Sequence, residues 1–162
     1  MEEIYQFKCL TDLREIINKL NSYYARPVEQ GQRATLYPNR DDGQYKTVMG
    51  IRVCDYKLSI DGKWVLPDNQ MGLSFSSSWR HLSKAYKMVS RSAGKQVDVY
   101  WVLSGADIPD GMSFQPDLRP SQSAKGHFLL TVNERMKTGS LAKKLKWVAD
   151  RMSVIRAAGK VL

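Results

Sequence analysis

Residues 97–103 read Val-Asp-Val-Tyr-Trp-Val-Leu, and this stretch decides the fold class. β-Branched and aromatic side chains dominate it, and Gly94 and Gly105 bound it, so the pattern predicts a buried strand. Residues 127–132, His-Phe-Leu-Leu-Thr-Val, are apolar enough for a second, central strand of the same sheet. The chain therefore contains a sheet built from segments that are distant in sequence.

Three segments around these strands show helical periodicity. Thr11 is a candidate N-cap for a helix over residues 11–22, a serine of residues 74–78 caps a second helix, and Ser140 caps a last one. The apolar faces of these helices are Leu13, Ile16, Ile17, Leu20 and Tyr24; then Trp79, Leu82, Tyr86 and Val89; then Leu141, Leu145, Val148, Met152 and Ile155.

Other segments predict short strands and turns. Residues 45–65 alternate around Asp61-Gly62, which indicates a hairpin. Residues 23–28 are expected to be extended, because Pro27 disfavours a helical conformation at Arg26. Residues 29–44 predict an irregular excursion, and residues 67–70 predict a turn. Residues 105–120 predict a long surface loop with one short strand near Met112. We therefore expect one α+β domain over residues 1–162, with helices outside a mostly antiparallel sheet.

The composition excludes several classes of protein. The longest apolar run, Val99 to Leu103, is far shorter than the ~18–20 residues of a membrane-spanning helix. The first residues are acidic and polar, which predicts no cleaved signal peptide. Cys9 and Cys54 lack metal-ligand spacing, so we expect no metal site and a reducing, cytoplasmic location. The net charge is +9, and more than half of it falls in residues 139–162.

Familiar catalytic motifs are absent, so single residues carry the functional prediction. His127 opens a predicted strand after Lys125-Gly126, where an imidazole could orient a ligand or act as a general base. Ser74 and Ser76 precede a helix, where hydroxyls either cap the helix or contact a ribose or phosphate. Arg26 lies two residues after Tyr24, so its guanidinium could bind an anionic group beside an aromatic ring.

A dinucleotide site needs an anion clamp, small residues against the sugar, an aromatic platform and a polar group at the reacting carbon. Arg26, the two serines Ser74 and Ser76, Phe75 and His127 provide these parts from separate strands. Each of these residues also has an ordinary structural explanation. His81, which lies off the apolar face of its helix, is expected to be a solvated surface histidine.

Several short motifs together resemble one protein family, the type VI secretion exported effector 2 toxins. The resemblance covers residues 66–148 and rests on these motifs: Pro67, Gly72-Leu-Ser-Phe-Ser76, residues 99–103, Asp107-Ile-Pro-Asp-Gly111, Lys125-Gly-His-Phe-Leu-Leu130, Met136 and the basic last helix. It implies an ADP-ribosyltransferase-like fold with His127 and Ser74 as catalytic residues. It also implies that Arg26, Tyr24, Ser74, Phe75 and Ser76 bind NAD.

The resemblance thus predicts a bacterial cytotoxin that binds NAD and transfers or cleaves ADP-ribose in the cytosol of an attacked cell. An immunity protein would neutralise it in the producing cell, and the +9 charge favours an acidic one. Two departures matter: the order Tyr-Ala-Arg26 replaces Tyr-Arg, and no Glu-x-Glu pair is present, with Glu134 the only nearby carboxylate after His127.

Two alternatives remain open at this point. One is a small basic ribonuclease that uses His127 as general base, with Lys125 or His81 as its acid. The other is a basic module that binds nucleic acid or protein through its last helix and carries no chemistry. Nucleic acid is a less favoured partner than an acidic protein, because the basic residues lie away from the proposed site.

Overall fold

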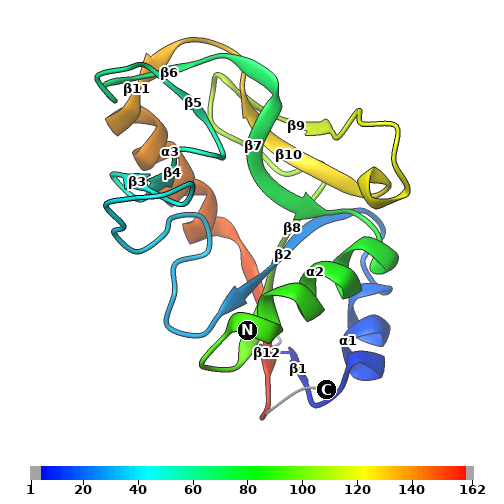
Figure 1. Cartoon of the computed structure of the whole chain (residues 1–162). Coiled ribbons are helices and arrows are strands. Elements are labelled where there is room, and N and C mark those ends of the chain that lie inside the picture. The colour runs from blue at the N-terminus through cyan, green and yellow to red at the C-terminus, as the bar shows by residue number, and fades with distance from the viewer. Residues whose placement is uncertain (1–4, 160–162) are drawn as a thin grey trace.

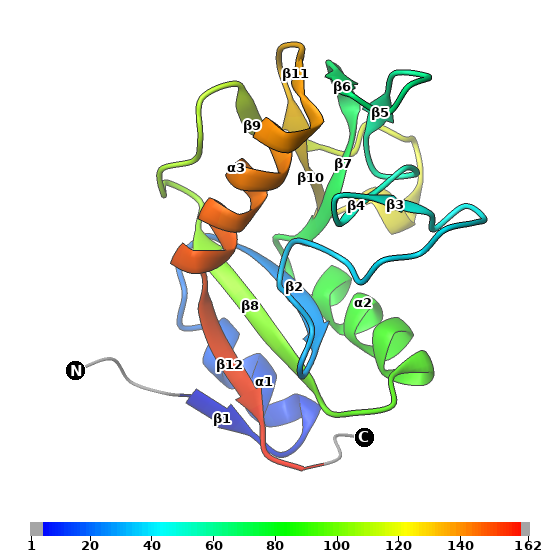
Figure 2. The same cartoon turned by 90° about the vertical axis from the view of Figure 1, so that its left-hand side faces the viewer.

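A mixed sheet of seven strands organises residues 5–159, which are the residues that the computed structural model describes, apart from the side chain of Ser123. Its order is β1-β12-β8-β2-β7-β10-β9, and every neighbouring pair is antiparallel except β1 with β12. The strands are β1 Tyr5–Phe7, β2 Tyr23–Glu29, β7 Asp68–Ser76, β8 Val97–Leu103, β9 Met112–Pro116, β10 His127–Val132 and β12 Ser153–Ala157. The expected α+β architecture with a mostly antiparallel sheet is confirmed (Figures 1 and 2).

The helices pack against the sheet through two clusters of buried side chains. Helices α1 (Leu10–Ile17) and α2 (Trp79–Ser92) share one cluster with Tyr23 and Ala25 of β2. Helix α3 (Thr138–Arg151) packs on the other cluster, which includes Phe75 of β7. In Figure 1, α1 and α2 lie together at the lower right while α3 lies at the upper left.

Smaller strands and one 3₁₀ turn complete the fold. The expected hairpin at Asp61-Gly62 is confirmed as β5 (Lys57–Leu58) with β6 (Trp64–Leu66), and Gly62 has a φ of 72°. Strand β11 (Met136–Lys137) pairs with β6, and β3 (Thr47–Val48) pairs with β4 (Ile51–Arg52). A 3₁₀ turn, η1, spans Gln122–Ala124.

Two helix boundaries differ from those expected. The first helix ends at Ile17 rather than at residue 22, and its N-cap is Cys9 rather than Thr11. The second helix begins after Ser78, whose Oγ accepts a hydrogen bond from the backbone amide of His81 at 3.3 Å, as expected for a serine cap.

The prediction of one last helix that includes Ile155 was wrong. Its N-cap is Lys137 rather than Ser140, and helix α3 ends at Arg151. Residues 153–157 then form β12, where Ile155 is fully buried between β1 and β8. This segment forms a strand rather than a continuation of the helix because β12 makes backbone hydrogen bonds with two neighbouring strands, β1 and β8. Arg156 therefore lies in a strand rather than in the helix, and Lys160 lies outside the described residues.

The turn expected at residues 67–70 was also wrong, because β7 already begins at Asp68. Asp68 pairs with Val132 of β10, and its Oδ1 accepts from the backbone amide of Gln70 at 2.8 Å. An aspartate that accepts from the amide two residues later is typical of turns, yet here the backbone of this segment lies in the sheet.

Gly72 allows β7 and β10 to approach closely. A Cβ at this position would lie 2.3 Å from the carbonyl oxygen of Leu130 and 2.6 Å from its carbonyl carbon. The same oxygen accepts a hydrogen bond from the Tyr56 hydroxyl at 2.6 Å. A side chain would therefore force the two strands apart, two residues before Ser74.

Candidate active site

Ser74 and His127 meet across the antiparallel pair β7 and β10. Leu129 is opposite Ser74 and His127 is opposite Ser76, so these polar side chains leave the same face of the sheet. Nε2 of His127 lies 3.0 Å from Oγ of Ser74, whose side chain is exposed. The structure thus brings together the two residues that the resemblance assigns to catalysis.

Asp117 lies on the other side of the His127 ring. Strand β9 ends opposite the start of β10, with Pro116 facing Phe128, and the backbone amide of Asp117 donates to the carbonyl of His127 at 2.9 Å. Oδ2 of Asp117 is 2.8 Å from Nδ1 of His127, and the Asp117 side chain is only 4% exposed. If Nδ1 donates its proton to this carboxylate, Nε2 is left to accept from the Ser74 hydroxyl.

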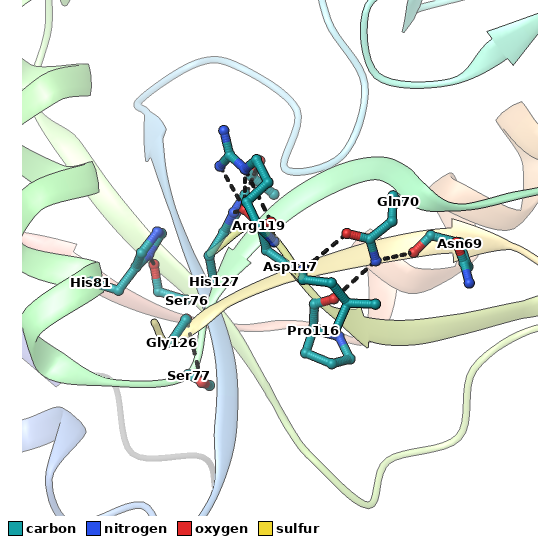
Figure 3. Close-up of polar contacts among 12 residues, drawn as sticks. Asn69, Gln70, Ser76, Ser77, His81, Pro116, Asp117, Arg119, Gly126 and His127 are labelled. Atoms are coloured by element: carbon teal, nitrogen blue, oxygen red, sulfur yellow. Dashed lines mark hydrogen bonds and ion pairs between the residues drawn. The ribbon is translucent and has the colours of Figure 1, made fainter. Parts of the chain in front are cut away.

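Arg119 holds Asp117 in its charged form. Its Nε donates to both carboxylate oxygens at 3.0 and 2.9 Å, its Nη2 donates at 2.5 Å, and its backbone amide donates at 2.9 Å (Figure 3). These bonds from Arg119, with a smaller one from His127, hold the pKa of Asp117 well below its usual range. The imidazole therefore faces a fixed negative charge at neutral pH.

Gln70 at the start of β7 ties the same segment to the sheet. Its Nε2 donates to the carbonyl of Pro116 at 3.1 Å, and its Oε1 accepts from the amide of Leu118 at 2.9 Å (Figure 3). These two bonds flank Asp117, so the carboxylate is positioned by β7 as well as by β9 and β10.

A second serine and histidine pair lies beside the first. Nδ1 of His81 is 2.5 Å from Oγ of Ser76, and the His81 ring stacks on the His127 ring with centroids 4.9 Å apart and an angle of 7°. Burial, with a further contribution from His127, lowers the pKa of His81 to about 4. The expected solvated histidine is therefore wrong: His81 is half-buried, hydrogen-bonded and uncharged at neutral pH.

Arg26 reaches Ser74 from the opposite side of β7. Strands β2 and β7 pair only at Ala25 and Ser76, and beyond this pair the Arg26 side chain bridges the two strands. Its Nη1 donates to the carbonyl of Ser74 at 3.0 Å, and its Nη2 donates to the Tyr37 hydroxyl at 3.0 Å. Arg26 thus contacts the backbone of Ser74 from the face of the sheet that carries Phe75, whereas His127 contacts the Ser74 hydroxyl on the other face.

The aromatic residues expected at the site lie in the packed cluster under α3. Phe75 is 1% exposed, and its ring meets Phe114 edge-on at 5.0 Å. Tyr24 stacks on Phe114 at 4.0 Å and 15° and contacts Phe128 at 5.0 Å. Because side chains alternate along a strand, Phe75 lies on the opposite face of β7 from Ser74 and Ser76. Tyr24 and Phe75 are therefore not brought together with the serine and histidine side chains, and Ser76 itself is 1% exposed.

A cavity of 410 Å³ adjoins the carboxylate end of the site. Its lining contains two cations, Arg119 and Lys125, and one anion, Asp117. The other lining residues are Pro120, Ser121, Gln122 and Ala124. The positive charges make this cavity suited to an anionic group.

Glu134, the carboxylate that follows His127 most closely in sequence, lies at the far end of β10. The backbone amide of the neighbouring Asn133 donates a hydrogen bond to the carbonyl of Gly111, at the turn that leads into β9. Across residues 5–159 we find no group of three or more histidine, cysteine, aspartate or glutamate side chains placed to hold a metal ion.

Asp117 and Arg119 are the site residues that sequence reasoning missed. The sequence predicts this segment as a long surface loop with one short strand around residues 112–114, and it names no partner for that strand. Pairing that strand antiparallel to residues 127–132 would have placed residue 117 beside His127, so the signal was the polar Asp-Leu-Arg sequence at a strand end.

Comparisons with known proteins assign the chain to no family. No family model, no curated protein and no solved structure matches the chain. Within the part of the chain that the structure describes, none of the helices has the length and apolar character needed to cross a membrane.

Proposed function

We propose that the chain is a toxin-type enzyme that binds NAD and transfers or cleaves ADP-ribose. The observation that supports it is the convergence on Ser74: Nη1 of Arg26 bonds its carbonyl at 3.0 Å, and Nε2 of His127 approaches its hydroxyl at 3.0 Å. Arg26, Ser74 and His127 lie on β2, β7 and β10. Arg26 and His127 therefore both contact Ser74, the first at its carbonyl on the Phe75 face and the second at its hydroxyl on the opposite face.

His127 would act as the general base. In the proposed reaction the bond between the ribose C1 and the nicotinamide nitrogen breaks, and nicotinamide leaves with the electron pair. An oxygen nucleophile bonds to C1 and gives its proton to Nε2 of His127, directly or through the Ser74 hydroxyl. Water as nucleophile releases ADP-ribose, and an acceptor hydroxyl gives transfer. Asp117 stabilises the imidazolium that forms.

Charge near the site suits the diphosphate of NAD. Arg119 and Lys125 line the adjoining cavity, and each terminal nitrogen of Arg26 carries a second N–H beyond its single bond to Ser74 or Tyr37. We assign Tyr24 and Phe75 to holding Arg26 and the strands in place, because both rings pack inside the molecule: the Arg26 guanidinium lies 5.6 Å from the Phe75 centroid.

The test incubates purified protein with NAD and measures both the loss of NAD and the release of nicotinamide. We expect the wild type to consume NAD, and His127→Ala and Ser74→Ala to lose about 10²–10⁴-fold in rate, the usual share of a general base. Ser104→Ala, at an exposed serine in the turn after β8, is the matched control. A folded wild type that leaves NAD intact, or variants that match it in rate and in toxicity to bacteria, would refute the proposal.

Ribonuclease activity is the second candidate, and the stacked pair of histidines favours it. Two imidazoles with centroids 4.9 Å apart could serve RNA cleavage, with His127 as base. His81 is an uncharged imidazole at neutral pH, since its pKa is lowered to about 4, and it lacks the acidic proton of an imidazolium, so Lys125 would have to be the acid. Incubation with total RNA and with NAD in parallel separates the candidates: RNA cleavage with unchanged NAD refutes the first.

An acidic immunity protein is the partner that we propose for the producing cell. Lysines 63, 137 and 143 line a 760 Å³ cavity between β6 and the start of α3, and no acidic side chain is among its lining residues. Complementary charge would speed association and make it sensitive to salt. Reversing Lys63 and Lys143 to glutamate should slow binding of such a partner at low salt, and unchanged association would count against this surface.

A further inference from the structure

The geometry points to a second chemical capability: Ser74, His127 and Asp117 form a nucleophilic triad in which Oγ of Ser74 makes a covalent bond with the substrate. This inference goes beyond NAD cleavage, because it concerns esters that carry an anionic group and requires no dinucleotide. It rests on three side chains whose order of contact is serine, histidine and aspartate.

The distances meet the requirement for an activated serine. A nucleophile and its base need to lie within about 2.6–3.2 Å, with a third group orienting the base. Oγ of Ser74 is 3.0 Å from Nε2 of His127, and Nδ1 of His127 is 2.8 Å from Oδ2 of Asp117. Such a constellation is recognised by geometry and by the role of each residue, whatever their order in the sequence.

Regular sheet pairing holds this arrangement. Ser74 and His127 are fixed by the register of β7 with β10, and Asp117 is fixed by the register of β10 with β9. Arg119 then clamps the carboxylate, which is 4% exposed. The aspartate is therefore charged and oriented before any substrate binds, which is the preorganisation that such a reaction needs.

Access to the nucleophile is open. The Ser74 side chain is exposed while His127 is 13% exposed, so an ester can reach Oγ while the imidazole stays mostly shielded. Arg119 and Lys125 in the adjoining cavity favour an acyl or phosphoryl group with negative charge. The neighbouring Ser76 lacks this capability, because it is 1% exposed.

The covalent step balances without a co-reactant. Oγ of Ser74 bonds to the carbonyl carbon of the ester as its proton moves to Nε2 of His127. The bond from that carbon to the leaving oxygen then breaks, and the leaving alkoxide takes the proton from Nε2. Water repeats the same two steps on the acyl-serine, which releases the carboxylic acid and restores the Ser74 hydroxyl.

A fluorophosphonate probe tests the inference. Oγ of Ser74 would displace fluoride from phosphorus, and mass spectrometry of the peptides should locate the adduct on Ser74. We expect His127→Ala to abolish labelling, Asp117→Asn to slow it by about 10²–10⁴-fold, and Ser104→Ala to label at the wild-type rate. Near-ultraviolet circular dichroism of each variant shows whether it is folded.

The outcomes separate this inference from NAD cleavage. A folded wild type without an adduct on Ser74, or a folded His127→Ala that labels Ser74 at the same rate, would overturn the triad. NAD consumption is measured on the same preparations without the probe. Labelling without NAD loss keeps the triad and refutes the NAD proposal, while NAD loss without labelling does the reverse.

Discussion

Replacing Gly72 by alanine tests whether close contact between β7 and β10 is required. The new Cβ would lie 2.3 Å from the Leu130 carbonyl oxygen, against 3.4–4 Å for an ordinary contact, so the strands must separate by about 1 Å. The atoms that must move are backbone atoms, which neighbouring pairs hold in place. They cannot rotate away as the end of a flexible side chain would.

The cost follows from two terms. Overpacking of this kind costs about 1–3 kcal/mol, and weakening the bond from the Tyr56 hydroxyl to the Leu130 carbonyl costs about 0.5–1.5 kcal/mol. Alanine lowers the entropy of the unfolded chain, which offsets up to about 1 kcal/mol. We expect a net loss of about 2–3 kcal/mol, which lowers Tm by roughly 4–12 °C in a chain of this size.

Urea unfolding followed by tryptophan fluorescence measures the free energy of unfolding for Gly72→Ala. Gly105→Ala is the matched control, because a Cβ there meets no atom within 4 Å and its φ is not positive. The reasoning fails if the two variants have free energies of unfolding within about 0.5 kcal/mol of each other, since a contact between strands would then cost no more than an exposed turn.

The remaining predictions concern pH, a hydrogen bond and the core. The folded state holds the pKa of His81 at about 4, against 6.5 for a free histidine, so the His81 contribution to stability is full above pH 6.5 and falls as the pH drops toward 4. After allowance for solvent screening, we expect the free energy of unfolding to fall by about 1–2 kcal/mol over this range. Urea unfolding of His81→Gln should not show this decrease. Tyr37→Phe removes the acceptor of a guanidinium hydrogen bond and should cost about 1–2 kcal/mol in thermal unfolding, where Tyr45→Phe, which removes an exposed hydroxyl, costs almost nothing; equal Tm values would contradict this. Leu145→Ala should cost about 2–5 kcal/mol because Leu145 is 1% exposed, whereas Met88→Ala, at a side chain 66% exposed, should stay within about 0.5 kcal/mol, and a similar loss in both would argue against this packing.

Elements with a strong local signal could be predicted from the sequence. Residues 97–103 and 127–132 combine apolar and β-branched side chains, and both are strands. Gly94 and Gly105 bound the first segment, and Gly126 precedes the second. The serine cap of α2 satisfies a local amide, so it too is visible in a short window. Helix, strand and turn preferences of neighbouring residues agree with the fold in these places.

Features that depend on distant partners could not be predicted. Ile155 continues the apolar spacing of a helix, yet its place is set by β1 and β8, which lie far away in sequence. Asp117 became a site residue only through the pairing of β9 with β10, and His81 only through Ser76 on β7. Local pattern carries no information on such registers, which tertiary packing decides.

The position of β12 has a consequence for synthesis of the chain. Strand β1, at residues 5–7, obtains its neighbour in the sheet from residues 155–157, so this pairing must wait until residue 157 has left the ribosome. Strand β8 likewise keeps one open edge until β12 is made. Closing such a long loop is slow, and an unpaired edge invites pairing with another chain. A nascent chain should therefore stay incompletely folded, and exposed to chaperones and proteases, until β12 has been made.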